Sequence, residues 1–173
     1  MTVRTDHPIV TAILDRHRDE LGMDLVTYRN HVLRGMNYHG LLFGAELPDA
    51  AVLAWTVHDL GIWTAATFDY LEPSAALVDE YAAIAGVVDI GAARRMVLDH
   101  HRLRGVGDRL TETFRLADRI DVSHGLLRSG LTRDAVHTIV AALPYHGFHA
   151  FLLRAGSGWA LRHPGRPLPM LRW

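Results

Sequence analysis

The chain has 173 residues, a formal net charge of −1 at pH 7 and an apolar content of 49 %. This length predicts one domain, the composition excludes a disordered chain, and the near-neutral charge argues against nucleic acid as a partner. Because the chain has no cysteine, it has neither a disulfide framework nor a zinc finger.

Apolar residues recur at every third or fourth position through the first half of the chain, which predicts amphipathic helices. We expect helices over residues 9–22, 25–44, 50–60 and 73–86. The helix over 50–60 is apolar on nearly every side, so we expect it to be buried, with Gly61 as its C-terminal stop. Pro73 and Ser74 mark the start of the fourth helix.

The same pattern continues in the second half, with helices expected over residues 90–101, 110–127 and 132–143 and a shorter one over 147–160. Gly105 and Gly107 indicate a turn, Thr132 is a typical N-cap, and Pro144 ends the helix before it. No segment alternates as a strand would. The predicted fold is all-α: one domain of about seven helices over 1–173, ending in a helical arm and proline-rich tail over 131–173.

Histidine is abundant, with 12 residues, and one of them has unusual surroundings. His58 and Asp59 lie together at the C-terminal end of the apolar helix over 50–60. Ionisable groups at the end of a buried helix cost several kcal/mol each when they are unpaired. A divalent metal ion removes that cost, because neutral imidazole and carboxylate are good ligands for it. A helix end with ordinary hydrogen bonds is the alternative.

Two further residues of the same chemical types flank this pair on other expected helices. His31 lies in an Asn-His-Val segment, and Asp118 interrupts an apolar face in Ala-Asp-Arg-Ile-Asp. The order His31, then His58 and Asp59 in an HDLG segment, then Asp118, resembles the HD-domain superfamily of metal-dependent hydrolases. The segment 99–105, which contains two adjacent histidines, resembles the His-His segment that precedes a glycine turn in many members. The resemblance covers a motif core over residues 25–128 and implies an all-helical fold.

The resemblance also implies a metal site and a mechanism. One divalent transition metal ion (manganese, iron, cobalt, nickel or zinc) would bind to His31, His58, Asp59 and Asp118. Such an ion acidifies a bound water and polarises the group that the water attacks. Asp59 would take part in catalysis, with His100 or His101 as a general acid or as the group that binds a substrate oxyanion.

The number of metal ions follows from what lies between the HD pair and Asp118. Two-metal members of the superfamily carry a further histidine where this chain has Asp79-Glu80-Tyr81. Glu80 is a carboxylate ligand in principle, but an exposed helical charge is the favoured interpretation. We therefore expect a single ion.

The substrate expected from this resemblance is a small phosphate ester or nucleotide. Many phosphodiesterase members bind phosphate through a lysine after the HD pair, whereas this chain has no lysine and continues with Gly61 and Ile62. Arg95 and Arg104 are candidate phosphate ligands because guanidinium forms bidentate contacts, and Trp63 is a candidate pocket wall. Arg34 and Arg102 could bind phosphate through the same bidentate contacts. Phe68 and Tyr70 are further candidates for the pocket wall.

Two alternatives to a phosphohydrolase stay open. The segment 58–64 also resembles the cyanamide-hydratase-like branch of the superfamily, which implies the addition of water to a small carbon–nitrogen substrate or a related lyase reaction. A non-catalytic HD-fold binding module with vestigial ligands is the second alternative.

The C-terminal arm is aromatic, apolar and basic as far as Arg172 and Trp173. Such a segment can lie on an anionic membrane surface or clamp over a partner helix. Packing on its own domain or on a second subunit is the favoured interpretation, so a homo-oligomer through this arm is a candidate assembly. No run approaches the ~18 apolar residues of a membrane span, and residues 1–6 do not resemble a signal peptide. We therefore expect a cytoplasmic enzyme.

Overall fold

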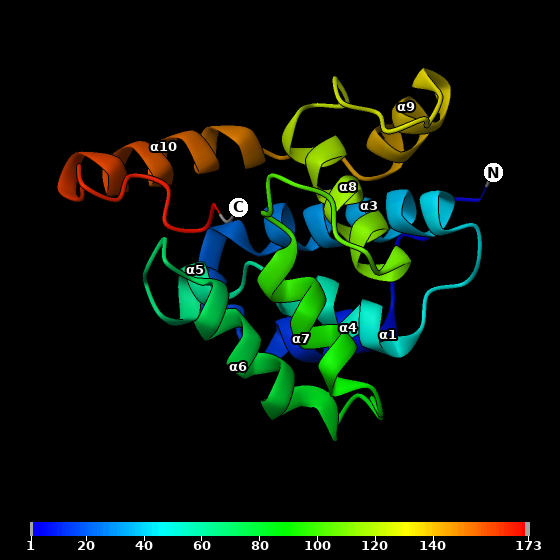
Figure 1. Cartoon of the computed structure of the whole chain (residues 1–173), viewed down its shortest axis with the longest axis horizontal. Coiled ribbons are helices and arrows are strands. Elements are labelled where there is room, and N and C mark those ends of the chain that lie inside the picture. Colours follow the sequence, from blue (N-terminus) through cyan, green and yellow to red (C-terminus); the bar gives the residue numbers. More distant parts are fainter. Residues whose placement is uncertain (1, 172–173) are drawn as a thin grey trace.

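Helices follow one another along the chain, and no strand occurs in the described part of it, residues 2–171 of the computed structural model. In that range the elements are α1 (Pro8–Arg16), α2 (Arg18–Leu21), the 3-10 helix η1 (Gly22–Asp24), α3 (Leu25–Phe43), α4 (Asp49–Val57), α5 (Gly61–Thr64), α6 (Leu71–Ala82), α7 (Ile90–Asp99), α8 (Arg109–Val122), α9 (Arg133–Ala142) and α10 (Phe148–Arg162). The predicted all-α single domain is confirmed (Figure 1).

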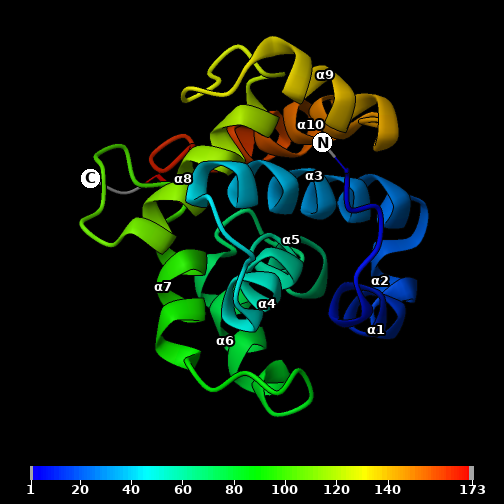
Figure 2. The same ribbon diagram turned by 90° about the vertical axis from the view of Figure 1, so that its right-hand side faces the viewer.

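The longest helix, α3, runs through the middle of the molecule. Figure 2 shows α1, α4, α6 and α7 on one side of it and α9 and α10 on the other. α8 packs along α3, and α4 packs against α1, α3, α6 and α7. Residues 50–57 of α4 are all buried, as its apolar sequence predicts. The C-terminal end of α4 therefore reaches the centre of the domain.

A close contact between α3 and α4 sets the position of that end. A Cβ atom on Gly35 would lie 2.1 Å from the ring of Trp55, so the indole fits only against glycine. The Trp55 indole N–H donates to Nδ1 of His39 (3.0 Å), and its ring stacks on Phe114 with 4.1 Å between centroids. Trp55 is three residues from His58, so this contact also fixes His58 relative to α3.

Several helix boundaries in the first half differ from the prediction. The helix expected over 9–22 is interrupted at His17, whose ring nitrogen Nε2 lies 2.8 Å from the Tyr81 hydroxyl. Gly61 was predicted to end the helix over 50–60, but in the structure it begins α5. A Cβ on Gly61 would lie 2.8 Å from Ser74 Oγ, so this glycine allows α6 to approach. α6 starts at Leu71, with Pro73 inside its first turn, where a missing N–H costs no bond.

Two helices of the second half, α7 and α8, end earlier than their patterns suggest. α7 stops at Asp99, so His100 and His101 lie just beyond its end. α8 stops at Val122, and the chain then turns through His124 in the left-handed region (φ +55°). The predicted N-cap is confirmed, because the Thr132 hydroxyl accepts from the Ala135 N–H (3.1 Å).

The C-terminal arm packs on its own domain. Phe148 is buried with its ring stacked on the His31 ring (centroids 4.2 Å apart), and Phe151 stacks on Trp63 (4.8 Å). Met170 in the tail is buried beside Phe68 and Tyr70. Residues 172 and 173 lie outside the described part. Association through this arm stays a prediction, and no helix within residues 2–171 is long and apolar enough to cross a membrane.

Candidate metal centre

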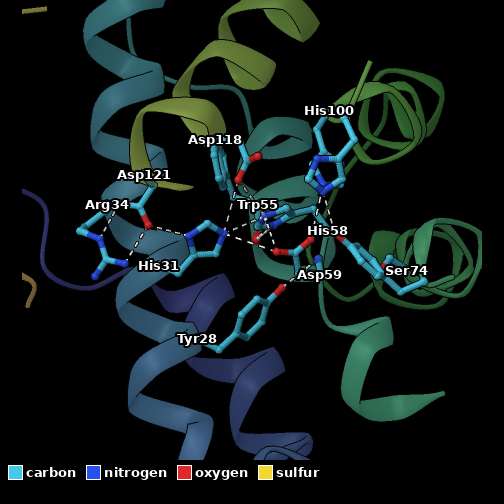
Figure 3. Close-up of polar contacts among 12 residues, drawn as sticks. Tyr28, His31, Arg34, Trp55, His58, Asp59, Ser74, His100, Asp118 and Asp121 are labelled. Carbon is cyan, nitrogen blue, oxygen red and sulfur yellow. Dashed lines mark hydrogen bonds and ion pairs between the residues drawn. The ribbon is translucent and has the colours of Figure 1, made fainter. Parts of the chain in front are cut away.

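Three helices bring the four predicted ligands close together, and the end of a fourth helix brings His100 beside them. His31 lies on α3, His58 and Asp59 at the end of α4, His100 just after α7, and Asp118 on α8 (Figure 3). All five side chains are buried. Residues far apart in the sequence therefore form one polar cluster inside an otherwise apolar core.

Hydrogen bonds from the far side of each ring fix the orientation of the three histidines. Nδ1 of His58 lies 2.9 Å from the Trp55 carbonyl oxygen, and Nδ1 of His100 lies 2.7 Å from the Val97 carbonyl oxygen. A carbonyl oxygen only accepts, so each Nδ1 carries a hydrogen. Nδ1 of His31 likewise donates to the Asp121 carboxylate at 2.7 Å. In the neutral form of each ring, Nε2 therefore presents a lone pair to the centre.

The nitrogen and oxygen atoms that face the centre lie close to one another. His31 Nε2 lies 3.0 Å from His58 Nε2, Asp59 Oδ2 lies 3.6 and 3.4 Å from these two nitrogens, and Asp118 Oδ1 lies 3.6 and 3.8 Å from them. Ligands bound ~2.1 Å from one transition metal ion lie about 3.0–3.4 Å apart. Two of the five separations fall within this range, and the other three exceed it by 0.2–0.4 Å.

Unpartnered polar atoms support the same conclusion. Asp59 Oδ1, Asp118 Oδ1 and His100 Nε2 are buried without a hydrogen-bond partner, which is costly unless something else binds them. Three overlapping groups place their ligand atoms within 4.8 Å of one another: His31, His58 and Asp118; His58, Asp59 and His100; His100, His101 and Asp118. The buried centre can therefore hold a metal ion.

The charges of the cluster also favour a cation. Burial lowers the pKa of His31, but the hydrogen bond to Asp121 and the nearby Asp59 carboxylate outweigh burial and raise it to about 9. Burial lowers the pKa of His58 to about 3, so this ring stays neutral and accepts from the His31 imidazolium. Burial raises the pKa of Asp118 to about 6. Burial opposes ionisation of Asp59, yet the neighbouring His58 and His100 hold its pKa well below the ordinary value.

An ion pair outside the cluster supports His31. Arg34 donates from Nε and Nη2 to the two carboxylate oxygens of Asp121 (2.6 and 2.8 Å), and from Nη1 to the carbonyls of Leu143 and Pro144. Arg34 is therefore a buried structural residue and not a surface phosphate ligand. Asp121 is the last residue of the Ala-Asp-Arg-Ile-Asp segment and was not among the predicted site residues. Its spacing of three residues from Asp118 was the available signal, because such residues share a helix face.

The adjacent histidines after α7 point to different places. His100 faces the cluster, and its Nε2 lies 3.4 Å from Asp59 Oδ1. His101 is half-buried, and its Nε2 lies 2.6 Å from the Tyr70 hydroxyl. Burial and the nearby His100 hold the pKa of His101 well below its ordinary value. Tyr28, which the sequence did not suggest, accepts from the Asp59 backbone N–H (3.3 Å) and donates to the Thr56 carbonyl (3.0 Å).

The predicted substrate-binding residues lie away from the cluster. Arg95 and Arg104 are exposed, and Arg95 lines a separate surface cleft of about 300 Å³ together with Arg102. The Trp63 indole donates to Asp24 (3.2 Å) and stacks on Phe151. Glu80 is exposed on α6, as the favoured interpretation has it. Within residues 2–171, Arg95, Arg104 and Trp63 form no hydrogen bond, ion pair or ring contact with the four predicted ligands.

A larger cleft opens directly onto the cluster. Its volume is about 590 Å³, and Asp59, Tyr70 and His101 lie at one end of it. Phe68 also lines it, so two of the three aromatic residues considered as pocket walls do so. Because Asp59 belongs both to the cluster and to the cleft wall, a molecule in the cleft can reach the metal ligands.

Comparison of the chain with protein-family models, with curated proteins and with solved structures gives no match. What is established is an all-helical domain with a buried group of histidines and aspartates able to hold a metal ion.

Proposed function

We propose that this chain is a metal-dependent hydrolase of the HD type. The observation that carries the proposal is that the Nε2 atoms of His31 and His58 each lie within 3.8 Å of a carboxylate oxygen of Asp59 and of Asp118 in the buried core. The hydrogen bonds at the other ring nitrogens orient these ligands, as in many protein metal sites. The order of the four residues along three helices matches the HD pattern.

A divalent ion bound there supplies an acidified water and polarises the electrophile of the substrate. The chain itself supplies proton transfer and orientation around that position. His100 Nε2 is buried without a partner and faces Asp59, so it can take or give a proton next to the ligands. Burial raises the pKa of Tyr70, which therefore keeps its hydrogen and can donate to a substrate oxygen or nitrogen at the end of the cleft.

A small phosphate ester is the first candidate substrate, because the ligand set suits the hydrolysis of such esters in the superfamily that the chain resembles. The second candidate reaction is the addition of water to a small carbon–nitrogen substrate. The cleft favours this second reaction, because none of its described lining residues is an arginine, and an arginine fork is the group that most often neutralises phosphate in proteins without lysine.

A paired activity screen tests the proposal. The protein is loaded in turn with Mn²⁺, Co²⁺, Fe²⁺, Ni²⁺ and Zn²⁺ and tested for phosphate release from mononucleotides and for hydration of cyanamide and simple nitriles. We expect one of the two activities, and we expect Asp59→Ala to abolish it. Asp134→Ala, on the exposed face of α9, is the matched control that keeps it. Activity that persists in Asp59→Ala refutes the metal role, and metal binding without turnover supports a non-catalytic module.

A further inference from the structure

The cleft above the cluster has walls from three separate parts of the chain. One wall is α10, the second is the tail around 167–171, and the third is the segment 68–70 before α6. The tail is fixed at two points: Arg166 pairs with Asp69 (Nη1 to Oδ2, 2.9 Å), and the Trp159 indole N–H donates to the Arg166 carbonyl (3.1 Å). The cleft is therefore a feature built by the fold and not a gap left by a loose end.

The interior of this cleft is apolar along most of its length. Leu152, Leu153, Leu168 and Met170 line it, together with Phe68. Its ionisable lining residues in the described chain are Asp59, Tyr70 and His101, and the Tyr70 hydroxyl lies 2.6 Å from His101 Nε2. A polar group is therefore accommodated at one end and an apolar group along the remainder.

Glycine on α10 provides part of the space. A Cβ on Gly156 would lie 3.5 Å from the ring of Phe68, on the opposite wall. Any longer side chain at this position would extend into the cleft. Gly158, two residues further on the same helix, does not line the cleft, and a Cβ there would approach only Arg162 (3.9 Å). The two glycines thus form a matched pair for substitution.

We propose that this cleft binds an apolar group of the substrate, with the reacting polar group held at Asp59, Tyr70 and His101. The substrate class is an uncharged small molecule with an alkyl or aryl group, and this assignment rests on the second of the two reactions proposed for the metal centre. A volume of about 590 Å³ lies within the range of small-molecule sites, roughly 300–1,000 Å³. The continuity of the cleft with Asp59 favours a small molecule over a second copy of the chain.

Binding of a homologous series of uncharged amides tests the proposal. Butanamide, hexanamide and octanamide are titrated into the metal-loaded protein by calorimetry. Each methylene group buried in the cleft lowers the dissociation constant about fourfold, so we expect a fall of about fifteenfold from one amide to the next. Gly156→Leu should remove this dependence on chain length, whereas Gly158→Leu should keep it. Both substitutions improve helix propensity equally, so folding does not separate them.

Three results would overturn the proposal. Affinity could be independent of chain length in the parent protein, or Gly156→Leu and Gly158→Leu could bind the amides alike. The amides could also fail to bind while Gly156→Leu alone changes the sedimentation coefficient, which would show that a second copy covers the cleft. These measurements follow binding and not turnover. A failed activity screen with intact dependence on chain length therefore rejects the proposed reaction and leaves the cleft assignment standing.

Discussion

Replacement of Asp121 by asparagine separates the orientation of a metal ligand from the stability of the fold. The Asp121 carboxylate accepts from His31 Nδ1 at 2.7 Å and from the Arg34 guanidinium at 2.6 and 2.8 Å. Asparagine has nearly the same shape, and its side-chain oxygen can still accept from His31. The substitution therefore removes mainly the negative charge that raises the basicity of His31 Nε2.

The expected loss of metal affinity can be derived in two ways. Loss of such an outer partner typically lowers metal affinity 10- to 100-fold, which corresponds to about 1.4–2.8 kcal/mol. A hydrogen bond to a charged group contributes about 1.5–3 kcal/mol, so the two values agree. Competition with a fluorescent chelator measures the affinity, and Asp134→Asn on the surface of α9 is the control. An affinity for Asp121→Asn within about twofold of the parent protein would refute the role given to this carboxylate.

The same substitution leaves the Arg34 guanidinium without its counter-charge in a fully buried position. Breaking a buried ion pair in this way lowers the free energy of unfolding by about 3–5 kcal/mol. The double variant Arg34→Met with Asp121→Asn removes the unpaired charge. Urea unfolding should show that the double variant recovers most of the stability, while its metal affinity stays as low as that of Asp121→Asn. Recovery of both quantities together would show that the lost affinity reflects only a damaged fold.

Three further predictions concern protonation, packing and catalysis. The affinity of the metal-free protein for Mn²⁺ should rise with pH, because the raised pKa of His31 (about 9) keeps a proton on Nε2 that the ion must displace. Below the pKa of Asp118 (about 6) the rise should be steeper, since a second proton competes. An affinity that does not change with pH over this range contradicts both assignments. Gly35→Ala should lower the free energy of unfolding by about 1–3 kcal/mol, because the added Cβ would overlap the Trp55 ring. Gly40 lies on the same helix, but a Cβ there meets open space, so Gly40→Ala should raise the free energy of unfolding by about 0.5–1 kcal/mol. Equal changes in this free energy for the two substitutions would refute the packing argument. Tyr70→Phe should keep the metal and lower kcat about 100-fold on whichever substrate the screen identifies; an unchanged kcat would remove Tyr70 from the mechanism.

The periodicity of the sequence predicted the long helices well, and it failed where tertiary contacts decide. Helical spacing predicts a helix up to residue 22, but the His17 side chain pairs with Tyr81 and the helix breaks there. Gly61 has the usual appearance of a helix stop, yet its role is to let α6 approach. Neither contact can be inferred from neighbouring residues, because the partners lie far away in the sequence.

His58, Asp59 and Asp118 could be proposed as ligands because each interrupts an apolar helical stretch, and His31 could be added from its order along the chain relative to these three. Arg34 and Asp121 could not be paired from the sequence, since α3 and α8 bring them together across a sequence separation of 87 residues. The apolar cleft was also beyond sequence reasoning. Its walls come from segments 68–70, 152–160 and 167–171. The proline-rich tail is not helical, so no periodic pattern in its sequence predicts where it packs.

Metal content is the measurement that tests the central claim most directly. Protein purified without chelator, and the same protein after incubation with Mn²⁺ or Fe²⁺ and gel filtration, is analysed by plasma mass spectrometry. The centre described here predicts about one divalent transition metal ion per chain, lost in the double variant His58→Ala with Asp118→Ala and retained in Asp134→Ala. A parent protein that holds no more metal than the double variant after loading would contradict the metal centre and the function proposed for it.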